Sequence, residues 1–177
     1  GLQYRFGGPE NRFGYRMVSD IFTKDGFRIR FEYASAGKLA GIVSSRGERL
    51  KVETDELGRV CCVSMRQDGE ETRLVRYRYD DRGDMVETTD ALDVSKHFVY
   101  TDGHLLVQLT NQGGMSFHWE YEGKGENARC VHTWGDGGVM EYFIRYGKGY
   151  THIRNGEGAE TEYHYGEDKL IYKIVDA

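Results

Sequence analysis

The sequence is poor in proline, has no long hydrophobic run and carries no excess of positive charge. Pro9 is the one proline among 177 residues, and the glycines follow no period of three, which excludes a collagen-like chain. The longest clear apolar run covers residues 60–63, far below the roughly 18 residues that a transmembrane helix needs. The formal net charge is −5 and the pI is near 5.7, whereas nucleic-acid binding depends on a basic surface. We therefore expect neither membrane insertion nor a nucleic-acid partner.

Cysteines are also few, and their spacing matches no known framework. Cys61 and Cys62 are adjacent and Cys130 is distant; this odd, irregular set excludes a disulfide scaffold and a zinc site built from CxxC pairs. Because neighbouring residues of a strand point to opposite faces, we expect Cys61 and Cys62 to face opposite ways. At most one of them is then expected to be in a core.

What the chain has in abundance is glycine and aromatic residues. There are 24 glycines and 13 tyrosines, and aromatic residues make up 13% of the chain. That aromatic content is enough to bury surface, which excludes a disordered tract. The abundance of glycine and the scarcity of alanine and leucine argue against a helical bundle. The composition therefore predicts an all-β chain with many turns.

A tyrosine recurs along the chain, each time two residues after an aromatic or large apolar residue. The recurring residues are Tyr79, Tyr100, Tyr121, Tyr146 and Tyr165, with spacings of 21, 21, 25 and 19 residues. A second series of turn-forming acids and amides has spacings of 21, 25, 19 and 21 residues: Asp90, Asn111, Asp136, Asn155 and Asp176. The two series share the same steps, offset by one unit, so an internal repeat organises the chain. Phe31 and Tyr33 begin an earlier unit.

Each unit is expected to be a β-hairpin. One strand ends in the aromatic-x-Tyr pair, a turn follows, and a second strand returns with alternating polar and apolar residues. The turns contain glycine, which tolerates positive φ, at Gly37, Gly58, Gly83, Gly103 and Gly138. We predict one all-β domain over residues 1–177, with about 13 to 15 antiparallel strands in a twisted, curved ribbon. Residues 27–177 form the repeats, and residues 1–26 are a loosely matching lead-in.

This pattern resembles the YD repeats of the RHS family. Residues 79–92 read YDDRGDMVETTDAL, which has the form of the family's repeat signature. Residues 117–121 (FHWEY) and 128–138 (ARCVHTWGDGG) are similar to a stretch of bacterial RHS polymorphic-toxin proteins. Two departures stand out. Asp93 replaces the usual glycine, which predicts a distorted turn, and residues 40–76 keep the hairpin rhythm without the tyrosine pair.

The resemblance implies a structural role without catalysis. In this family the repeats form a hollow shell that encloses a C-terminal toxin, and the Tc-toxin cage and the teneurin barrel are similar. The partners it implies are the other RHS repeats of the same parent chain and the enclosed toxin. It also implies a secreted or surface-exported bacterial protein and an association with type VI secretion, although these residues do not identify the export route. Gly1 is not a natural start residue, so we expect a section of a longer protein.

The repeat predicts a sheet with two unlike faces. The aromatic residues of each pair share one face, and the residues between them point the other way: Arg78, Val99, Glu120, Arg145 and His164. The first face is apolar and aromatic, and the second is mostly polar. We expect Tyr33, Tyr79, Tyr100, Tyr121, Tyr146 and Tyr165 to anchor the hairpins. We also expect the open edges of the sheet to pair with another copy of the chain.

Four other functions are weaker interpretations of the same residues. The six histidines include no HxH or HxxxH pair, so no metal site is expected. Asp80, Asp81, Asp84 and Asp90 resemble the paired acids of a glycosidase, but the repeat already explains them as turn residues. The tripeptide of residues 82–84 reads RGD, as in adhesion motifs, and is weak evidence alone. The alternative that stays open is stacking of a carbohydrate on Trp119 and Trp134. We expect no cofactor and no catalytic residue.

Overall fold

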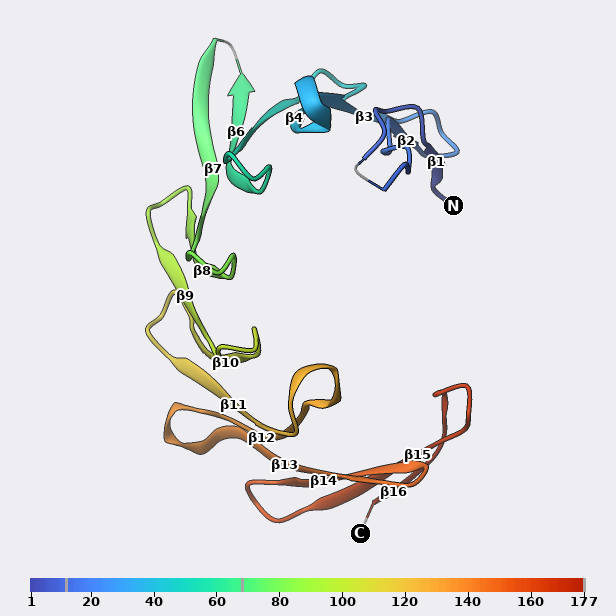
Figure 1. The fold of residues 1–177 in the computed structure, drawn as a ribbon, viewed down its shortest axis with the longest axis vertical. Coiled ribbons are helices and arrows are strands. Elements are labelled where there is room, and N and C mark those ends of the chain that lie inside the picture. The colour runs from blue at the N-terminus through green and yellow to red at the C-terminus, as the bar shows by residue number, and fades with distance from the viewer. Residues whose placement is uncertain (12, 68, 177) are drawn as a thin grey trace. The chain divides into compact units, whose positions relative to one another are not determined.

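The chain folds as a series of antiparallel strands. The computed structural model describes residues 1–11, 13–67 and 69–176. Its strands are hydrogen-bonded in chain order, from β1 to β16, as one open sheet (Figure 1). The predicted all-β class and hairpin arrangement are confirmed. None of the helices in the described part of the chain is long and apolar enough to span a membrane.

The strands are three to ten residues long. They are β1 (Gln3–Arg5), β2 (Asp20–Phe22), β3 (Arg28–Tyr33), β4 (Leu39–Ser44), β5 (Arg49–Thr54), β6 (Val60–Gln67), β7 (Glu70–Tyr79), β8 (Met85–Asp90), β9 (Ser95–Tyr100), β10 (Leu106–Thr110), β11 (Ser116–Glu122), β12 (Arg129–Gly135), β13 (Val139–Gly147), β14 (Tyr150–Asn155), β15 (Glu160–Tyr165) and β16 (Ile171–Asp176). Within the described residues, three short 3₁₀ helices interrupt them: η1 (Ser35–Gly37), η2 (Gly125–Asn127) and η3 (Asp136–Gly138).

The sheet has sixteen strands in the described residues, slightly more than the expected 13 to 15. The lead-in contributes β1 and β2, which pair with each other, and β2 pairs with β3. Residues 1–26 therefore extend the same sheet, although their sequence matches the repeat only loosely.

Contacts within the chain separate it into two compact units. The first unit contains residues 1–80 and 87–95, and the second contains residues 81–86 and 96–177. In the first unit, Val52 of β5 lies opposite Val63 of β6, and Cys62 of β6 opposite Arg76 of β7. In the second unit, the strands from β9 to β16 pair in sequence, for example Phe143 of β13 opposite Arg154 of β14. The single domain that we expect stays a prediction.

Most hairpins share one five-residue turn. In the turn that follows β5, the Asp55 N–H donates to the Arg59 carbonyl at 2.9 Å, and the Gly58 N–H donates to the Asp55 carbonyl at 3.0 Å. The Asp55 carboxylate accepts a further bond of 2.8 Å from the Arg59 N–H. This is a type I turn closed by a residue in the left-handed region, a standard connection between antiparallel strands. The same bonds close the turns that begin at Asn111 and Asn155.

The fourth turn position is left-handed in each case, which decides where glycine is needed. Gly58 has a φ of 82°, and Gly37, Gly83 and Gly138 also have positive φ. Gly103 does not. In its turn the fourth residue is His104, with a φ of 62°, and Gly103 lies one position before the residue that adopts the left-handed conformation.

Asp93 occupies the fourth position of another turn and has a φ of 62°. The turn keeps its two backbone bonds, from the Asp90 N–H to the Val94 carbonyl and from the Asp93 N–H to the Asp90 carbonyl. The expected distortion is therefore wrong, because aspartate tolerates the left-handed region better than most residues.

The sheet has very little buried interior. Among the described residues, Val52 is the only buried apolar side chain, and Asp20, Ser64 and Thr89 are the buried polar ones. All three cysteines are half-buried free thiols. Exposed apolar side chains lie along the strands, including Tyr142, Tyr146 and Ile174. Since a conventional core is missing from the described part, contacts between adjacent hairpins carry much of the organisation.

Candidate functional site

Five tyrosines of the predicted series make one recurring contact. Each lies at or next to the end of its strand, and its hydroxyl donates to a backbone carbonyl near the start of the preceding strand. The pairs are Tyr33 to Val18 at 2.7 Å, Tyr79 to Val60 at 2.9 Å, Tyr121 to Leu106 at 2.9 Å, Tyr146 to Cys130 at 2.8 Å and Tyr165 to Tyr150 at 3.4 Å. Tyr100, the sixth member, is half-buried in β9.

Burial affects the ionisation of these hydroxyls. Removal from water disfavours the phenolate, so burial raises the pKa of Tyr33, Tyr79, Tyr121 and Tyr146 above the ordinary value of 10.0. The hydroxyls are therefore neutral donors at physiological pH. A neutral donor is what a bond to a carbonyl oxygen requires.

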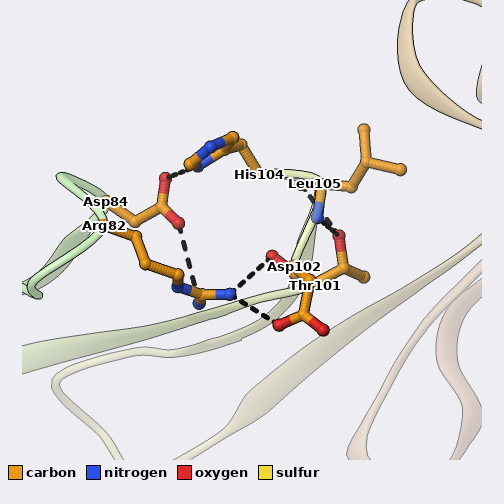
Figure 2. Close-up of polar contacts among 7 residues, drawn as sticks. Arg82, Asp84, Thr101, Asp102, His104 and Leu105 are labelled. Atoms are coloured by element: carbon orange, nitrogen blue, oxygen red, sulfur yellow. Dashed lines mark hydrogen bonds and ion pairs between the residues drawn. The ribbon is translucent and has the colours of Figure 1, made fainter.

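A second contact joins one turn to a turn farther along the chain. Figure 2 shows the example in the second unit, where the Arg82 guanidinium donates to the Thr101 carbonyl at 3.2 Å and to the Asp102 carboxylate at 2.9 Å. In the same cluster, Nδ1 of His104 lies 2.8 Å from the Asp84 carboxylate. Two adjacent turns are therefore held together by the Arg82 guanidinium and by the contact between His104 and Asp84.

Equivalent cation-to-turn contacts occur in the first unit. The Lys38 ammonium donates to the carbonyls of Asp55 and Glu56, at 2.9 and 3.0 Å. Arg73 pairs with the Asp93 carboxylate of a later turn. The separations are 17 to 20 residues, close to one repeat. Sequence reasoning missed these cations. The sequence signal that would have identified them is a lysine or arginine located about one repeat before a turn.

The Arg82 and Asp84 side chains of the RGD tripeptide both take part in this contact between turns. Arg82 is directed to the next turn, while the Asp84 side chain is only 10% exposed and faces His104. An adhesion motif needs both side chains extended from a loop tip. The observed arrangement instead uses them to join turns.

The two tryptophans do not share a surface. In the pairing of β11 with β12, Trp119 lies opposite Thr133, whereas Trp134 lies opposite His118. Neighbouring positions alternate between faces, so Trp119 and Trp134 project from opposite sides of the sheet. A single sugar platform containing both rings is therefore excluded by the register.

Trp134 takes part in a row of stacked rings on the face opposite Trp119. Its ring centroid lies 5.1 Å from that of His118 and 4.2 Å from that of His132. The His132 ring lies 4.3 Å from that of Phe143, and the Arg154 guanidinium lies 4.4 Å from the Phe143 centroid. The face predicted to be mostly polar thus also contains these aromatic rings.

Histidines of this face contact carboxylates on the same or adjacent strands. His132 lies 2.9 Å from Glu141, His152 lies 3.1 Å from Glu160, and His164 lies 3.0 Å from Glu162. His132 also lies 3.4 Å from Glu120 through its other ring nitrogen. In the ranges that the structure describes, no group of three or more His, Cys, Asp or Glu side chains is arranged to hold a metal ion.

Asp136, a member of the turn series, has a different environment from the other members. It begins η3, and its carboxylate accepts a 2.8 Å bond from the Ser116 N–H and lies 3.3 Å from Nε2 of His118. The Ser116 bond, followed by the His118 contact, lowers the pKa of Asp136 below its ordinary value of 3.8. It therefore links β11 to the end of β12 as an ionised group.

The fold and contacts define a class of protein in which tandem β-hairpins are joined side by side in one open sheet. Residues 10–171 match the family Teneurin YD-shell, and the chain belongs to this family. No curated protein sequence matches it.

Solved structures show the same fold. The chain superposes on a chain of the Photorhabdus luminescens Tc holotoxin pore with a TM-score of 0.65 and 13% identity, covering 91% of this chain and 9% of that one. A chain of the TcdB2-TccC3-TEV crystal structure gives a TM-score of 0.64 at 13% identity, covering 91% of this chain and 9% of that one. A chain of TcdB2-TccC3 without its hypervariable C-terminal region gives a TM-score of 0.60 at 15% identity, covering 82% of this chain and 7% of that one. The chain therefore spans less than a tenth of these structures.

Proposed function

We propose that the chain is a non-enzymatic section of the wall of an RHS-repeat shell, and that the shell encloses a C-terminal toxin of an exported bacterial protein. The partners in this proposal are the other repeats of the same parent chain and the enclosed toxin. The whole of residues 1–177 acts as one structural domain. Membership of the Teneurin YD-shell family supports the structural role.

The recurring tyrosine contact is the observation that carries the proposal. A wall needs a connection that is repeated along the chain and does not depend on a central core. The bonds of Tyr121 to Leu106 and Tyr146 to Cys130 fit that need, because each links the end of one strand to the start of its neighbour. In quasi-one-dimensional repeat proteins, stability comes from such contacts between neighbours.

The carboxylates that resemble a catalytic set have structural contacts. Asp90 accepts bonds from the Leu92 and Val94 N–H groups of its own turn, at 2.8 and 3.0 Å. Asp84 faces His104. These contacts support a role in shaping turns, and the proposal assigns no reaction to them.

The test is electron microscopy of the longest natural protein that contains this segment, combined with limited proteolysis. The proposal expects a closed hollow particle in which a C-terminal fragment resists protease. An extended ribbon with a digested C-terminal region would contradict it. Tyr121→Ala should open the wall and expose the fragment, because it removes both the ring and its bond. Tyr142→Ala is the matched control, since Tyr142 is 38% exposed.

A second candidate function is carbohydrate binding, and it now concerns Trp119 alone. Trp119 lines an open hollow of about 950 Å³ together with Leu105, Val107 and Lys124. A sugar ring can stack on an accessible indole face while polar groups bind its hydroxyls. Soluble glycans should then change the fluorescence of the wild-type chain and of Trp134→Phe, but not that of Trp119→Phe. Equal responses from all three would contradict this function.

A further inference from the structure

An open groove with a positive lining lies on the second unit. Its volume is about 730 Å³, and it is bounded by the end of β11, the η2 loop, and strands β12 to β14. Three arginines line it: Arg129, Arg145 and Arg154. Glu122 is the one carboxylate of the lining, so positive charge exceeds negative charge by two in a chain whose net charge is −5.

These arginines lack the carboxylate partners that arginines of the first hairpins have. Arg28 pairs with Asp20 and Arg49 pairs with Glu32. Across the described ranges, by contrast, no carboxylate lies within ion-pair distance of Arg129, Arg145 or Arg154.

Nearby carboxylates are directed to histidines instead. Glu160 stands opposite Arg154 in the strand pairing, yet its side chain contacts His152 at 3.1 Å. Glu141 likewise contacts His132, at 2.9 Å. These carboxylates do not line the groove, and the N–H donors of its arginines are not taken up by them.

Two of the three guanidinium groups are held by aromatic rings. The Arg154 guanidinium carbon lies 4.4 Å from the Phe143 ring centroid, and that of Arg129 lies 5.1 Å from the Tyr146 centroid. Such contacts restrict the long side chain while the N–H groups at its edge stay available to an acceptor. Less conformational freedom is then lost when a ligand binds.

We propose that this groove binds a phosphate-ester dianion. Guanidinium groups recognise tetrahedral oxyanions through paired N–H donors. A single carboxylate is satisfied by one such fork, whereas three forks with a net excess of two charges suit a doubly charged group with several terminal oxygens. The Asn127 amide, which also lines the groove, can donate to an additional ligand oxygen. The proposal does not rest on the shell function.

The first experiment is a titration of the isotope-labelled 177-residue chain with inorganic phosphate, monitored by the arginine side-chain NMR signals at constant ionic strength. The Arg145 and Arg154 signals should shift saturably. Arg145→Gln should weaken binding by about tenfold or more, because it removes a charge and a fork of donors. Arg145→Lys should restore part of the affinity, since it restores the charge without the fork.

The matched control is Arg76→Gln. Arg76 is an exposed strand arginine, and the described residues place no carboxylate within ion-pair distance of it. This variant should change the affinity less than twofold. An equal loss in Arg76→Gln and Arg145→Gln would overturn the proposal, because phosphate would then respond to overall charge. A linear, unsaturable shift would overturn it as well.

Two further probes separate the sources of the phosphate group. Glucose 6-phosphate represents a small soluble ester, and vesicles of phosphatidylcholine with phosphatidic acid represent a lipid headgroup. Tighter, Arg145-dependent binding of the sugar phosphate than of inorganic phosphate identifies a soluble ester. Arg145-dependent sedimentation with the acidic vesicles identifies a lipid source. Equal binding of glucose and glucose 6-phosphate would contradict recognition of the phosphate.

Discussion

The hydroxyl of Tyr121 donates a 2.9 Å hydrogen bond to the backbone carbonyl of Leu106, fifteen residues earlier. Tyr33 and Tyr165 reach carbonyls at the same separation of fifteen residues. The separation is sixteen residues for Tyr146 and nineteen for Tyr79, because the strands β6 and β7 of the Tyr79 hairpin are longer. The spacing of tyrosines in the sequence thus reflects the length of one hairpin.

Replacing Tyr121 with phenylalanine should destabilise the chain by about 1 kcal/mol, within the usual range for one neutral hydrogen bond. The ring and its packing stay, so the change isolates the hydroxyl and the carbonyl that loses its donor. Urea unfolding followed by circular dichroism measures the difference. Tyr142→Phe is the control. Tyr142 is exposed, and removing its hydroxyl should change the free energy of unfolding by less than about 0.5 kcal/mol. Equal effects of the two substitutions would contradict a role for the Tyr121 bond.

The turn at Asp93 should accept glycine but reject a β-branched residue. Asp93→Gly relieves the cost of a positive φ and loses an exposed ion pair with Arg73. Because these effects oppose each other, the net change should be below about 0.5 kcal/mol. Asp93→Val should cost about 1–2 kcal/mol, since its Cβ is crowded in the left-handed region. Thermal unfolding of both variants provides the comparison, and a tolerated valine would argue against the left-handed turn.

Asp20 should contribute to stability in a pH-dependent way. The residue is only 4% exposed. Burial raises its pKa, but hydrogen bonds from Arg28 and Ser19, together with the positive charges of Arg28 and Arg5, outweigh burial and lower the pKa below the ordinary 3.8. A carboxyl group with a lowered folded-state pKa stabilises the fold above its unfolded pKa, and this contribution is lost as the pH falls through the folded value.

Asp20→Asn should therefore destabilise the chain by about 1–3 kcal/mol at neutral pH. The difference from wild type should be constant from neutral pH down to the region of 3.8 and should shrink at lower pH. Urea unfolding at a series of pH values measures it. Asp81→Asn is the control, because Asp81 is exposed. A wild-type advantage that persists unchanged in strong acid would contradict the assignment.

Much of this fold could be predicted from local sequence rules. The tyrosine series located strand ends because its period matches one hairpin, and Asp55, Asn111 and Asn155 marked turns through their own side-chain bonds. His104 was missed because a histidine in the left-handed region has no local signature. Its contact with Asp84 lies twenty residues away.

The faces of the sheet were harder to predict where the strand register is irregular. The pairing of β11 with β12 shifts between Glu120 and Tyr121, and a shift of one residue exchanges the two faces. Trp119 and Trp134 lie in the regular part of this pairing, and their separation follows from the register there. A sequence period of two does not reveal which residue of the adjacent strand lies opposite.

The edge strand β16 should promote self-association of the chain. Its residues include Ile171, Tyr172 and Ile174, which are 56%, 72% and 56% exposed, and its pairing is with β15. An exposed apolar edge strand offers free backbone donors and acceptors to another copy, and a charged side chain on such a strand opposes pairing. Sedimentation analysis should show a mass that rises with concentration for the wild type but not for Ile174→Lys. Val99→Lys introduces the same charge on the interior strand β9, where Val99 is 47% exposed, and should still associate. A wild-type chain that stays monomeric at the highest attainable concentration would contradict the prediction.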